Sequence, residues 1–341
     1  MNFIVGGGVH EHGRNCFYVE ADINYIVDCG IMRGAEKPYP RLTPEQIKSA
    51  KYLFLTHMHE DHIGAFGWLV KNGFCGLVVA SEETLAALPA YEKKLALPQA
   101  FGKVNIGTVG IEYGRSGHCA GSLWYAVTTQ SSKLLFSGDY CEHSCFNVDK
   151  IEGQSAELAV LDCALGNMPY NRQAQEEKII SFARETLKNG SLLLPVPKNG
   201  RAVDLIHLLG NLNCNFFVDG KLCAFFSAQE KNGYWIPRAV TGGIETLIYK
   251  PVDTRLHGIY LIADAQLATD AGKKTARHIV EDGGKILLTG HTDCGSEAER
   301  LVNGGLASEI AFNAHSCMAD DRAVISRNNF DKVVYNHSKD V

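Results

Sequence analysis

The order of apolar and polar residues divides the chain into two stretches with different predicted structure. Up to about residue 165, short apolar runs separated by turn residues predict β-strands. Thr43, Pro44 and Gln46 predict the start of a helix, because they supply an N-cap, a first-turn proline and the partner of a capping box. The expected strands are residues 16–21, 23–29, 51–56, 77–80, 123–129 and 133–137.

From about residue 166 the pattern changes to helical segments that alternate with apolar runs. Residues 171–189 and 201–209 have helical spacing, and a glycine follows the first of these segments. Such alternation is typical of a parallel sheet with helices on both faces, so we expect an α/β protein. The apolar runs are residues 192–197, 216–219, 259–263, 285–288, 310–313 and 332–335.

Composition narrows the class of protein. The chain has 341 residues, of which 45% are hydrophobic and 21% charged, as in an ordinary globular protein with room for two domains. Its net charge of −5 excludes a general basic surface for a polyanion, so contact with nucleic acid must be local.

We expect no signal peptide and no membrane partner, because the first residues lack a basic region and no apolar run reaches the length of a membrane span. Eleven cysteines without a Cys-x-x-Cys pair predict reduced thiols in the cytoplasm.

Residues 57–62, with the sequence His-Met-His-Glu-Asp-His, carry the strongest chemical signal. His57 and His59 project to the same side of an extended segment, because they lie two positions apart. Asp61 and His62 lie where the next helix begins, and they can face a second point nearby. The motif therefore predicts ligands for two adjacent metal ions. A structural zinc site is the weaker alternative, since such sites favour cysteine-rich tetrahedra.

Further histidines and aspartates follow apolar runs later in the chain. Side chains at the carboxyl ends of neighbouring strands gather along one rim of a sheet, so these residues can converge with residues 57–62. Asp139 is the expected bridge between two metals, because a carboxylate has one oxygen for each. Imidazole and carboxylate ligands without cysteine predict two divalent ions, zinc first, with manganese or iron as alternatives. The later candidates are His118, Asp139, Asp162, His315 and His337.

These motifs resemble the metallo-β-lactamase superfamily, and within it the β-CASP branch of nucleases. That branch includes ribonuclease J and the endonuclease of pre-messenger RNA cleavage and polyadenylation. Residues 54–64, 118–122 and 137–139 are similar to metal motifs of the superfamily. The parts that resemble features of the branch are Asp162, His315, His337 and residues 195–202, which form a Pro-x-x-x-x-Gly-Arg turn.

The resemblance implies a fold and the boundaries of its domains. The fold is an αββα metallo-β-lactamase sandwich interrupted by an inserted β-CASP α/β domain with a parallel sheet. We place the first part of the sandwich at residues 1–165, the inserted domain at residues 166–310 and the C-terminal return of the sandwich at residues 311–341. The inserted stretch is shorter than is usual for the family.

The resemblance also implies a role for each site residue. The ligands of the first metal are His57, His59, His118 and Asp139, and those of the second are Asp61, His62, Asp139 and His337. The catalytic residues are Asp61, His315 and Asp162. Among these, His315 protonates the leaving oxygen or holds the phosphate, and Asp162 orients His315.

Four residues are candidates for contact with the substrate, namely Ser122, Lys198, Arg201 and His291. Lys198 and Arg201 could equally be solvated surface residues, and His291 could belong to a turn that caps a helix. The histidines that we expect at the surface, in loops or in the core are His10, His12, His143, His207, His257 and His278.

The function that the resemblance implies is hydrolysis of a phosphodiester by a hydroxide that two metal ions activate. In the family, histidine at the position of His337 goes with RNA and an apolar residue goes with DNA, so RNA is the expected partner and DNA the second choice. One alternative is another binuclear-metal hydrolase, such as a lactonase, a thioesterase or a small phosphodiesterase. The other is an RNA-binding protein without catalytic activity. The sequence allows a homodimer but does not indicate an oligomeric state.

Overall fold

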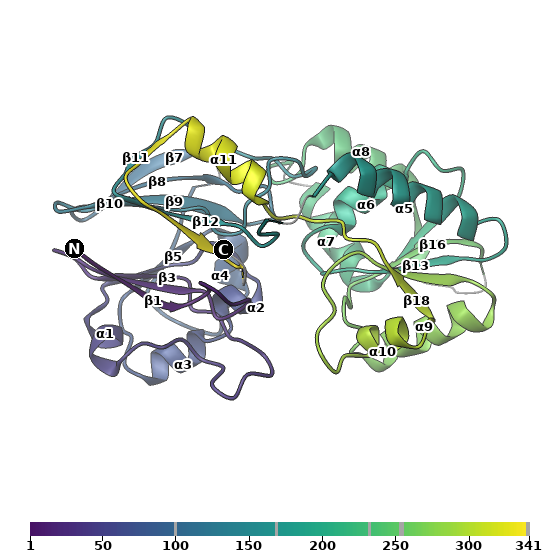
Figure 1. Cartoon of the computed structure of the whole chain (residues 1–341), viewed down its shortest axis with the longest axis horizontal. Helices are drawn as coiled ribbons and strands as arrows, with labels where there is room; N and C mark the ends of the chain where they lie inside the picture. The colour runs from purple at the N-terminus through teal and green to yellow at the C-terminus, as the bar shows by residue number, and fades with distance from the viewer. Residues whose placement is uncertain (99–100, 168–169, 231–232, 252–255, 339–341) are drawn as a thin grey trace. The chain divides into compact units, whose positions relative to one another are not determined.

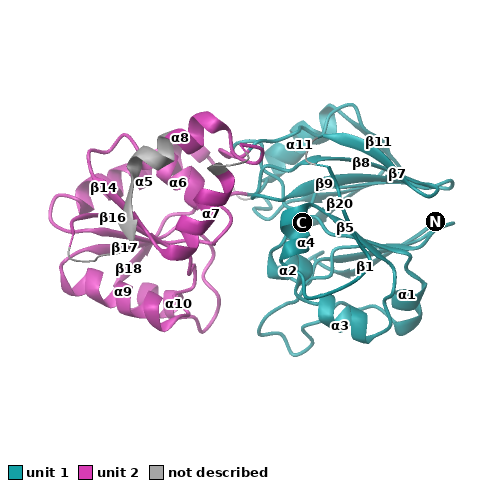
Figure 2. Ribbon diagram, turned by 180° about the vertical axis from the view of Figure 1, so that it is seen from behind, with its two compact units in different colours: residues 1–143, 147–170, 315–341 teal, residues 144–146, 171–314 magenta. Residues whose placement is uncertain are grey.

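The computed structural model describes the chain except for residues 99–100, 168–169, 231–232, 252–255 and 339–341 (Figure 1). The chain forms two compact units (Figure 2). Unit 1 comprises residues 1–143, 147–170 and 315–341, and unit 2 comprises residues 144–146 and 171–314. The domain limits drawn from the sequence lie a few residues before these boundaries, and they stay a prediction.

The first sheet of unit 1 has six strands in the order of the sequence. They are β1 (Asn2–Gly7), β2 (Cys16–Glu20), β3 (Tyr25–Val27), β4 (Tyr52–Phe54), β5 (Leu77–Ala80) and β6 (Lys94–Ala96). The strands pair antiparallel up to β3 and parallel from β3 onward. The helices of this half are α1 (Pro44–Ser49), α2 (Glu60–Ile63), α3 (Phe66–Lys71) and α4 (Glu82–Ala86).

The second sheet of unit 1 has the strand order β20-β12-β10-β9-β8-β7. Its strands are β7 (Gly102–Ile106), β8 (Val109–Arg115), β9 (Leu123–Thr128), β10 (Lys133–Phe136), β12 (Leu158–Asp162) and β20 (Val333–Asn336). Helix α11 (Met318–Ser326) follows unit 2 in the sequence, and β11 (Ser155–Ala156) pairs with β19 (Asn329–Phe330) beside the sheet.

The two sheets of unit 1 pack face to face through aromatic side chains. The ring of Phe17 lies 6.0 Å from that of Phe136, and the ring of Phe54 lies 5.8 Å from that of Tyr125. Helices α1 and α3 cover the outer face of the first sheet, and α11 packs on the second through Val324 (Figure 1). This is the expected αββα sandwich, in which apolar faces of all four layers are buried together.

Unit 2 is built on a six-stranded parallel sheet with the order β15-β14-β16-β13-β17-β18. The strands are β13 (Leu192–Pro195), β14 (Asn215–Val218), β15 (Ile248–Pro251), β16 (Gly258–Ile262), β17 (Lys285–Leu288) and β18 (Ala307–Glu309). Strands β13 and β16 are continuously apolar and fully buried, as expected for a sheet with helices on both faces. The helices are α5 (Arg172–Thr186), α6 (Ala202–Leu209), α7 (Gly220–Glu230), α8 (Arg238–Leu247), α9 (Asp270–Glu281) and α10 (Glu297–Asn303).

Local signals in the sequence explain several boundaries. Thr43 forms the expected capping box with Gln46 at the start of α1, and the side chain of Asn171 caps α5. The strand predicted at residues 310–313 is wrong, because the strand lies at Ala307–Glu309. The apolar residue Phe312 suggested a strand here, but Phe312 lies in the irregular segment after β18, where its ring is buried. In the described part of the chain, no helix has the length and apolar character needed to cross a membrane.

Candidate metal centre

The candidate ligands of unit 1 lie where strands of the two sheets end. Residues 57–62 join the end of β4 to α2, and His59 is the N-cap residue of that helix. In the second sheet β8, β10, β12 and β20 run in the same direction, so their carboxyl ends share one edge. The residues that follow or end these four strands are His118, Asp139, Asp162 and His337. The predicted rim is therefore present in the fold.

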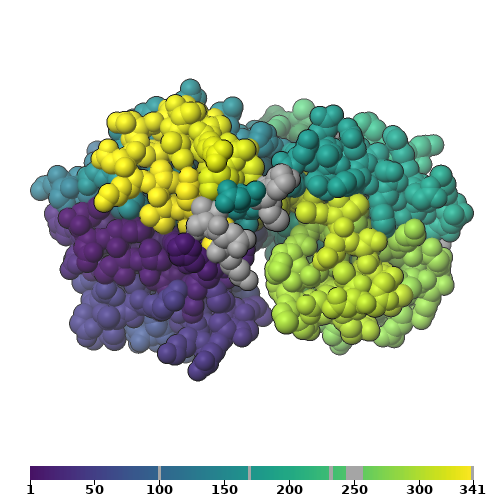
Figure 3. All heavy atoms as spheres, viewed as in Figure 1, coloured from purple at the N-terminus to yellow at the C-terminus, as the bar shows by residue number. Residues whose placement is uncertain are grey.

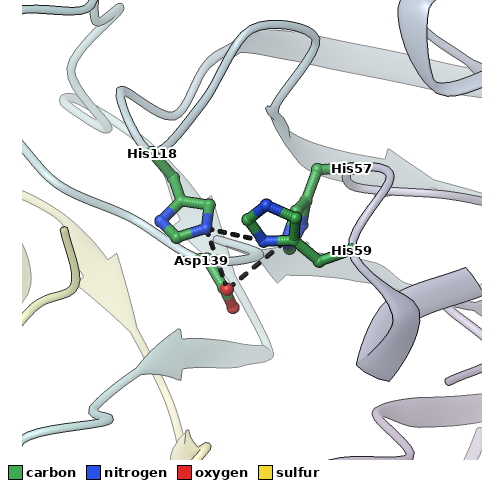
Figure 4. Close-up of side chains that lie close together, drawn as sticks. All are labelled: His57, His59, His118 and Asp139. Atoms are coloured by element: carbon green, nitrogen blue, oxygen red, sulfur yellow. Dashed lines mark hydrogen bonds and ion pairs between the residues drawn. The ribbon is translucent and has the colours of Figure 1, made fainter. Parts of the chain in front are cut away.

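The first group consists of His57, His59, His118 and Asp139 (Figure 4). Nδ1 of His59 lies 3.1 Å from Nε2 of His57 and 3.1 Å from Nε2 of His118. Oδ2 of Asp139 lies 3.4 Å from Nε2 of His57 and 3.4 Å from Nε2 of His118. In a tetrahedron with zinc–ligand bonds of about 2.0–2.1 Å, the ligand atoms stand about 3.3–3.4 Å apart. The four atoms therefore have the spacing of a tetrahedral cation site.

The second group consists of Asp61, His62 and His337, with the other oxygen of Asp139 beside it. Oδ2 of Asp61 lies 2.9 Å from Nε2 of His337 and 3.6 Å from Nε2 of His62. Nε2 of His62 lies 3.0 Å from Oδ1 of Asp139. Asp139 thus presents Oδ2 to the first group and Oδ1 to the second, as expected for a carboxylate placed between two cations.

The surroundings of Oδ1 of Asp139 indicate whether the residues of this cluster fit a metal ion. The atom is buried beside His62 Nε2 and 3.3 Å from His337 Nδ1, yet it has no hydrogen-bond partner among the described residues. A buried carboxylate oxygen without such a partner is costly in a folded protein. The unpartnered oxygen and the ring nitrogens that surround it are placed as ligands around a cation would be. The donor set, imidazole and carboxylate without thiolate, fits divalent metals.

Electrostatics separates the two groups of histidines. Burial lowers the pKa of the imidazoles in the first group, which are His57, His59 (to about 3) and His118. Burial acts in the same direction on His62 and His337, but nearby carboxylates, above all Asp139, outweigh it and raise both pKa values well above the ordinary value. For Asp139 itself, burial raises the pKa, while the surrounding imidazoles lower it well below its usual range.

His315 and Asp162 form a pair at the border of the cluster. Nδ1 of His315 lies 3.0 Å from Oδ2 of Asp162 and 3.7 Å from Oδ2 of Asp139. The backbone N–H of Tyr140 donates to the same Asp162 oxygen, which fixes the carboxylate. The side chain of His315 is 16% exposed, so the imidazole can meet a bound molecule, whereas Asp162 is buried. This arrangement lets Asp162 orient His315 and leaves Nε2 of the ring for the substrate.

Two buried residues to which the sequence analysis gave no role contact the second group. Asp28, directly after β3, accepts hydrogen bonds from Thr56 and lies 2.8 Å from Nδ1 of His62. Asn15, directly before β2, lies 2.9 Å from Nε2 of His62 through its side-chain nitrogen. Both residues adjoin apolar runs of the first sheet, but this position alone does not reveal their contacts with His62.

The candidate substrate contacts are less closely grouped. Ser122 is buried in unit 1, where its hydroxyl donates to the carbonyl of Cys119 and accepts from the N–H of the same residue, so it stabilises the turn after His118. Arg201 in unit 2 donates to the carbonyls of Thr289 and Phe312. The remaining two, Lys198 and His291, are exposed in unit 2.

One histidine that we expected to be an ordinary loop residue lies near the second group. His12 is exposed, and its ring centroid lies 5.4 Å from that of His337. Its loop is fixed by Glu11, which accepts hydrogen bonds from Arg14 and Arg41. His10 lies two positions before His12, but this pair alone gave no sign that His12 lies close to His337.

Comparison with known proteins adds a family to this geometry. The family model of the metallo-beta-lactamase superfamily matches residues 11–142. The transcription termination factor FttA of Methanocaldococcus jannaschii is 25% identical over 260 residues, which cover 63% of this chain and 41% of that protein. The endoribonuclease ysh1 of Schizosaccharomyces pombe is 23% identical over 243 residues, covering 61% of this chain and 32% of that protein.

A third relative and a solved structure agree with these matches. The cleavage and polyadenylation specificity factor 73 of Drosophila melanogaster is 24% identical over 238 residues, covering 60% of this chain and 34% of that protein. The chain thus spans less than half the length of each of these three relatives. A protein of unknown function from Enterococcus faecalis V583 shares the fold, with a TM-score of 0.64, 12% identity and coverage of 99% of this chain and 94% of that one. Residues 11–142 are thus similar to the metallo-β-lactamase superfamily, and the three relatives support its β-CASP branch.

Proposed function

We propose that this chain is a metal-dependent phosphodiesterase that hydrolyses RNA at the cluster of unit 1. The observation that carries the proposal is Asp139, whose two carboxylate oxygens face two separate groups of ligand atoms. Two adjacent cations are an established means of stabilising both the attacking and the leaving oxygen of a phosphoryl centre. One of the relatives is named an endoribonuclease, which supports RNA as the substrate.

The residues that would hold the first cation are His57, His59, His118 and Asp139, and those that would hold the second are Asp61, His62, His337 and Asp139. The edge lengths of the first group favour zinc, with manganese or iron as alternatives. When bound, divalent cations supply positive charge that polarises the phosphate and lowers the pKa of water. Asp61 belongs with the catalytic residues, because its partly exposed carboxylate borders both the second group and solvent.

His315 would serve as the proton donor of the reaction. Its Nδ1 is held by the buried carboxylate of Asp162, which keeps the ring in one orientation. Nε2 can then hydrogen-bond to the leaving oxygen of the substrate and deliver the proton as the P–O bond breaks. The pair resembles the histidine–carboxylate pairs of other hydrolases in its division of roles.

The cluster favours an anionic substrate although the chain carries a net charge of −5. Two divalent cations would add four positive charges, against the two carboxylates of Asp61 and Asp139, so the local field would be positive. We propose RNA over DNA because His337 occupies the position that distinguishes RNA-processing members of the family. Lys198, Arg201, His291 and Ser122 stay proposed substrate contacts. Eleven free thiols support a reducing compartment, the cytoplasm, and a homodimer is compatible with the proposal.

A cleavage assay with defined metal content tests this function. The purified chain is stripped of metal, reloaded with zinc or manganese, and incubated with end-labelled single-stranded RNA or DNA of one sequence. We expect cleavage of RNA that depends on metal and is lost in His59→Ala. If the loaded wild type and His59→Ala leave RNA equally intact, the proposal is wrong. Turnover of a lactone, a thioester or a small phosphodiester instead of RNA would identify a different hydrolase, and RNA binding without turnover would identify a binding protein.

A further inference from the structure

We propose that Gly8, Asn15 and Asn336 form a bracket that positions the ligands of the second cation, and that Asn15 is the residue on which occupancy of that site depends. This inference rests on the two-metal function proposed above. It assigns positioning roles to three residues that lie outside the ligand set. The bracket joins the segment after β1, the residue before β2 and the last residue of β20.

Asn15 contacts both ligands of the turn that begins α2. Its side-chain nitrogen lies 2.9 Å from Nε2 of His62, and it donates to the backbone carbonyl of Asp61 at 3.1 Å and to its carboxylate at 3.3 Å. The backbone N–H of Asn15 donates to the same carbonyl at 2.8 Å. Asn15 is fully buried, so water cannot replace these contacts. When a cation takes the lone pair of His62 Nε2, the donations to Asp61 remain, so the side chain of Asn15 holds the carboxylate of Asp61 beside the imidazole of His62.

Gly8 connects Asn15 to the third ligand, His337. A Cβ atom at Gly8 would lie 2.4 Å from Oδ1 of Asn15 and 2.4 Å from Oδ1 of Asn336, so both amide oxygens face this glycine. Its φ of +94° also belongs to a region that side chains rarely adopt. The carbonyl of Gly8 accepts a hydrogen bond of 2.7 Å from the N–H of His337, whose own φ is +68°. Gly8 thus holds the backbone of His337 in an uncommon conformation between the two asparagines.

The two amide oxygens indicate that the bracket serves more than stability. Oδ1 of Asn15 and Oδ1 of Asn336 are buried without a hydrogen-bond partner in the described part of the chain. Such atoms destabilise a fold, and departures of this kind are concentrated at functional sites. The space-filling view shows the C-terminal segment in yellow against the N-terminal segment in purple on unit 1 (Figure 3). The bracket lies where these two parts of the chain hydrogen-bond to each other.

The contacts of the bracket predict an effect on one cation only. They reach Asp61, His62 and His337, whereas His57, His59 and His118 depend on one another and on Asp139. Removing the side-chain nitrogen of Asn15 should therefore weaken the second site by about 10- to 100-fold, the usual cost of losing a partner that orients a ligand. The first site should keep its affinity.

The test compares Asn15→Leu, which is similar in size but cannot donate, with the wild type. Each metal-free protein is titrated with zinc, bound metal per chain is measured after equilibrium dialysis, and cobalt absorption reports the geometry of the first site. We expect two zinc ions for the wild type, and for Asn15→Leu one tight ion, one weakened by 10-fold or more, and an unchanged cobalt spectrum. Asn24→Leu is the matched control, because Asn24 binds Ala21 and Ser49 in the turn at the far end of β2.

The outcomes separate the two proposals. Two tight ions in Asn15→Leu would refute the bracket and leave the proposed function intact. Fewer than two ions in the wild type would refute the proposed two-metal function, and the bracket with it. Equal weakening of both sites would also refute the bracket, since it would reveal general damage to the fold. Should Asn15→Leu fail to fold, Asn15→Ser keeps a small polar side chain that does not reach His62, and the same expectations apply to it.

Discussion

Nδ1 of His62 lies 2.8 Å from Oδ2 of Asp28, and both side chains are fully buried. The hydroxyl of Thr56 donates to the same carboxylate oxygen, so the acceptor is fixed in place. When the ring nitrogen next to Asp28 carries the proton, Nε2 presents its lone pair to the second group of ligands. The pair therefore determines which tautomer of His62 the cluster contains.

Asp28→Asn should disturb this tautomer with little change in shape. The new amide can donate to Nδ1 of His62, which would place the proton on Nε2 and block that ligand atom. We expect RNA cleavage to fall about 10- to 100-fold, with a matching loss of affinity for the second zinc ion. Kinetics and metal titration of the same samples measure both effects. Asp22→Asn, in an exposed turn, is the control, and equal losses there would contradict the explanation.

Asp139→Asn should affect both cation sites at once. The substitution keeps the size of the side chain but removes the negative charge that lies between the two groups. Because bound metal ions stabilise the charge of the transition state by several kcal/mol and both would be held less well, we expect activity to fall by about 1,000-fold or more. Elemental analysis should show loss of metal beyond one ion per chain. Retention of two tightly bound ions would mean that Asp139 does not bridge them.

His315→Ala should separate catalysis from metal binding. The imidazole lies beside the cluster and is oriented by Asp162, so its loss removes proton transfer to the leaving oxygen. We expect kcat to fall about 100- to 10,000-fold, while zinc content stays at two per chain. A substrate with a good leaving group, such as a nitrophenyl phosphodiester, should be much less affected. Loss of metal in His315→Ala would instead make this residue a ligand.

The two cation sites should differ in their response to acid. His57, His59 and His118 have lowered pKa values, so in the metal-free chain they are mainly neutral at pH 7 and ready to bind. His62 and His337 have raised pKa values and are protonated at that pH, so a cation must displace their protons. The second metal should therefore leave first as the pH falls, and its binding should release protons. Calorimetric titrations in buffers of different ionisation enthalpy measure this release, and equal proton counts for both ions would contradict the assignment.

Asp321 in α11 should make stability depend on pH in the opposite direction from most carboxylates. Burial raises the pKa of Asp321 to about 8, and the charges of Asp162 and Asp320 act in the same direction. The folded chain therefore holds a proton that the unfolded chain loses near pH 4, so this contribution to stability is full below that pH and is lost as the pH rises through about 8. Asp321→Asn cannot ionise, so it should not lose stability as the pH rises, and its free energy of unfolding at pH 8 should exceed that of the wild type by about 2 kcal/mol or more.

Denaturant unfolding of metal-free Asp321→Asn and wild type at pH 5 and pH 8 measures this effect. The difference in free energy of unfolding between the two proteins should be larger at pH 8. Asp331→Asn is the control, because Asp331 is exposed, and its effect on the free energy of unfolding should not grow with pH. A difference that does not grow with pH would show that Asp321 is ionised in the folded chain.

The residues that the structure brings together as candidate ligands could be selected from the sequence because each occupies a local position with a chemical meaning. Asp139 and His337 follow apolar runs that become β10 and β20, and residues 57–62 combine three imidazoles with a carboxylate within one turn. The alternation of apolar runs and helical segments predicted the parallel sheet of unit 2, whereas the αββα sandwich was expected from the resemblance to the superfamily.

Asn15 and Asp28 could not be assigned in the same way. Their importance depends on distances to Asp61 and His62, which lie more than thirty positions away in the chain and come close only when β2, β3 and α2 pack together. An asparagine before a strand is an ordinary residue until its neighbours in space are known. The strand expected at residues 310–313 failed for a similar reason, since the strand lies at Ala307–Glu309. The buried ring of Phe312 gave the residues after this strand the apolar pattern of a strand.

The position of unit 2 in the sequence, between β12 and α11, has a consequence for the synthesis of the protein. A nascent chain that has reached residue 143 already carries His57, His59, His118 and Asp139, but His337 is translated only after residues 171–314. The ribosome thus delivers the last ligand of the second group after an entire additional unit. If the proposed function holds, an incomplete chain would carry the residues for the first cation alone, and we expect a truncated product of translation not to cleave RNA.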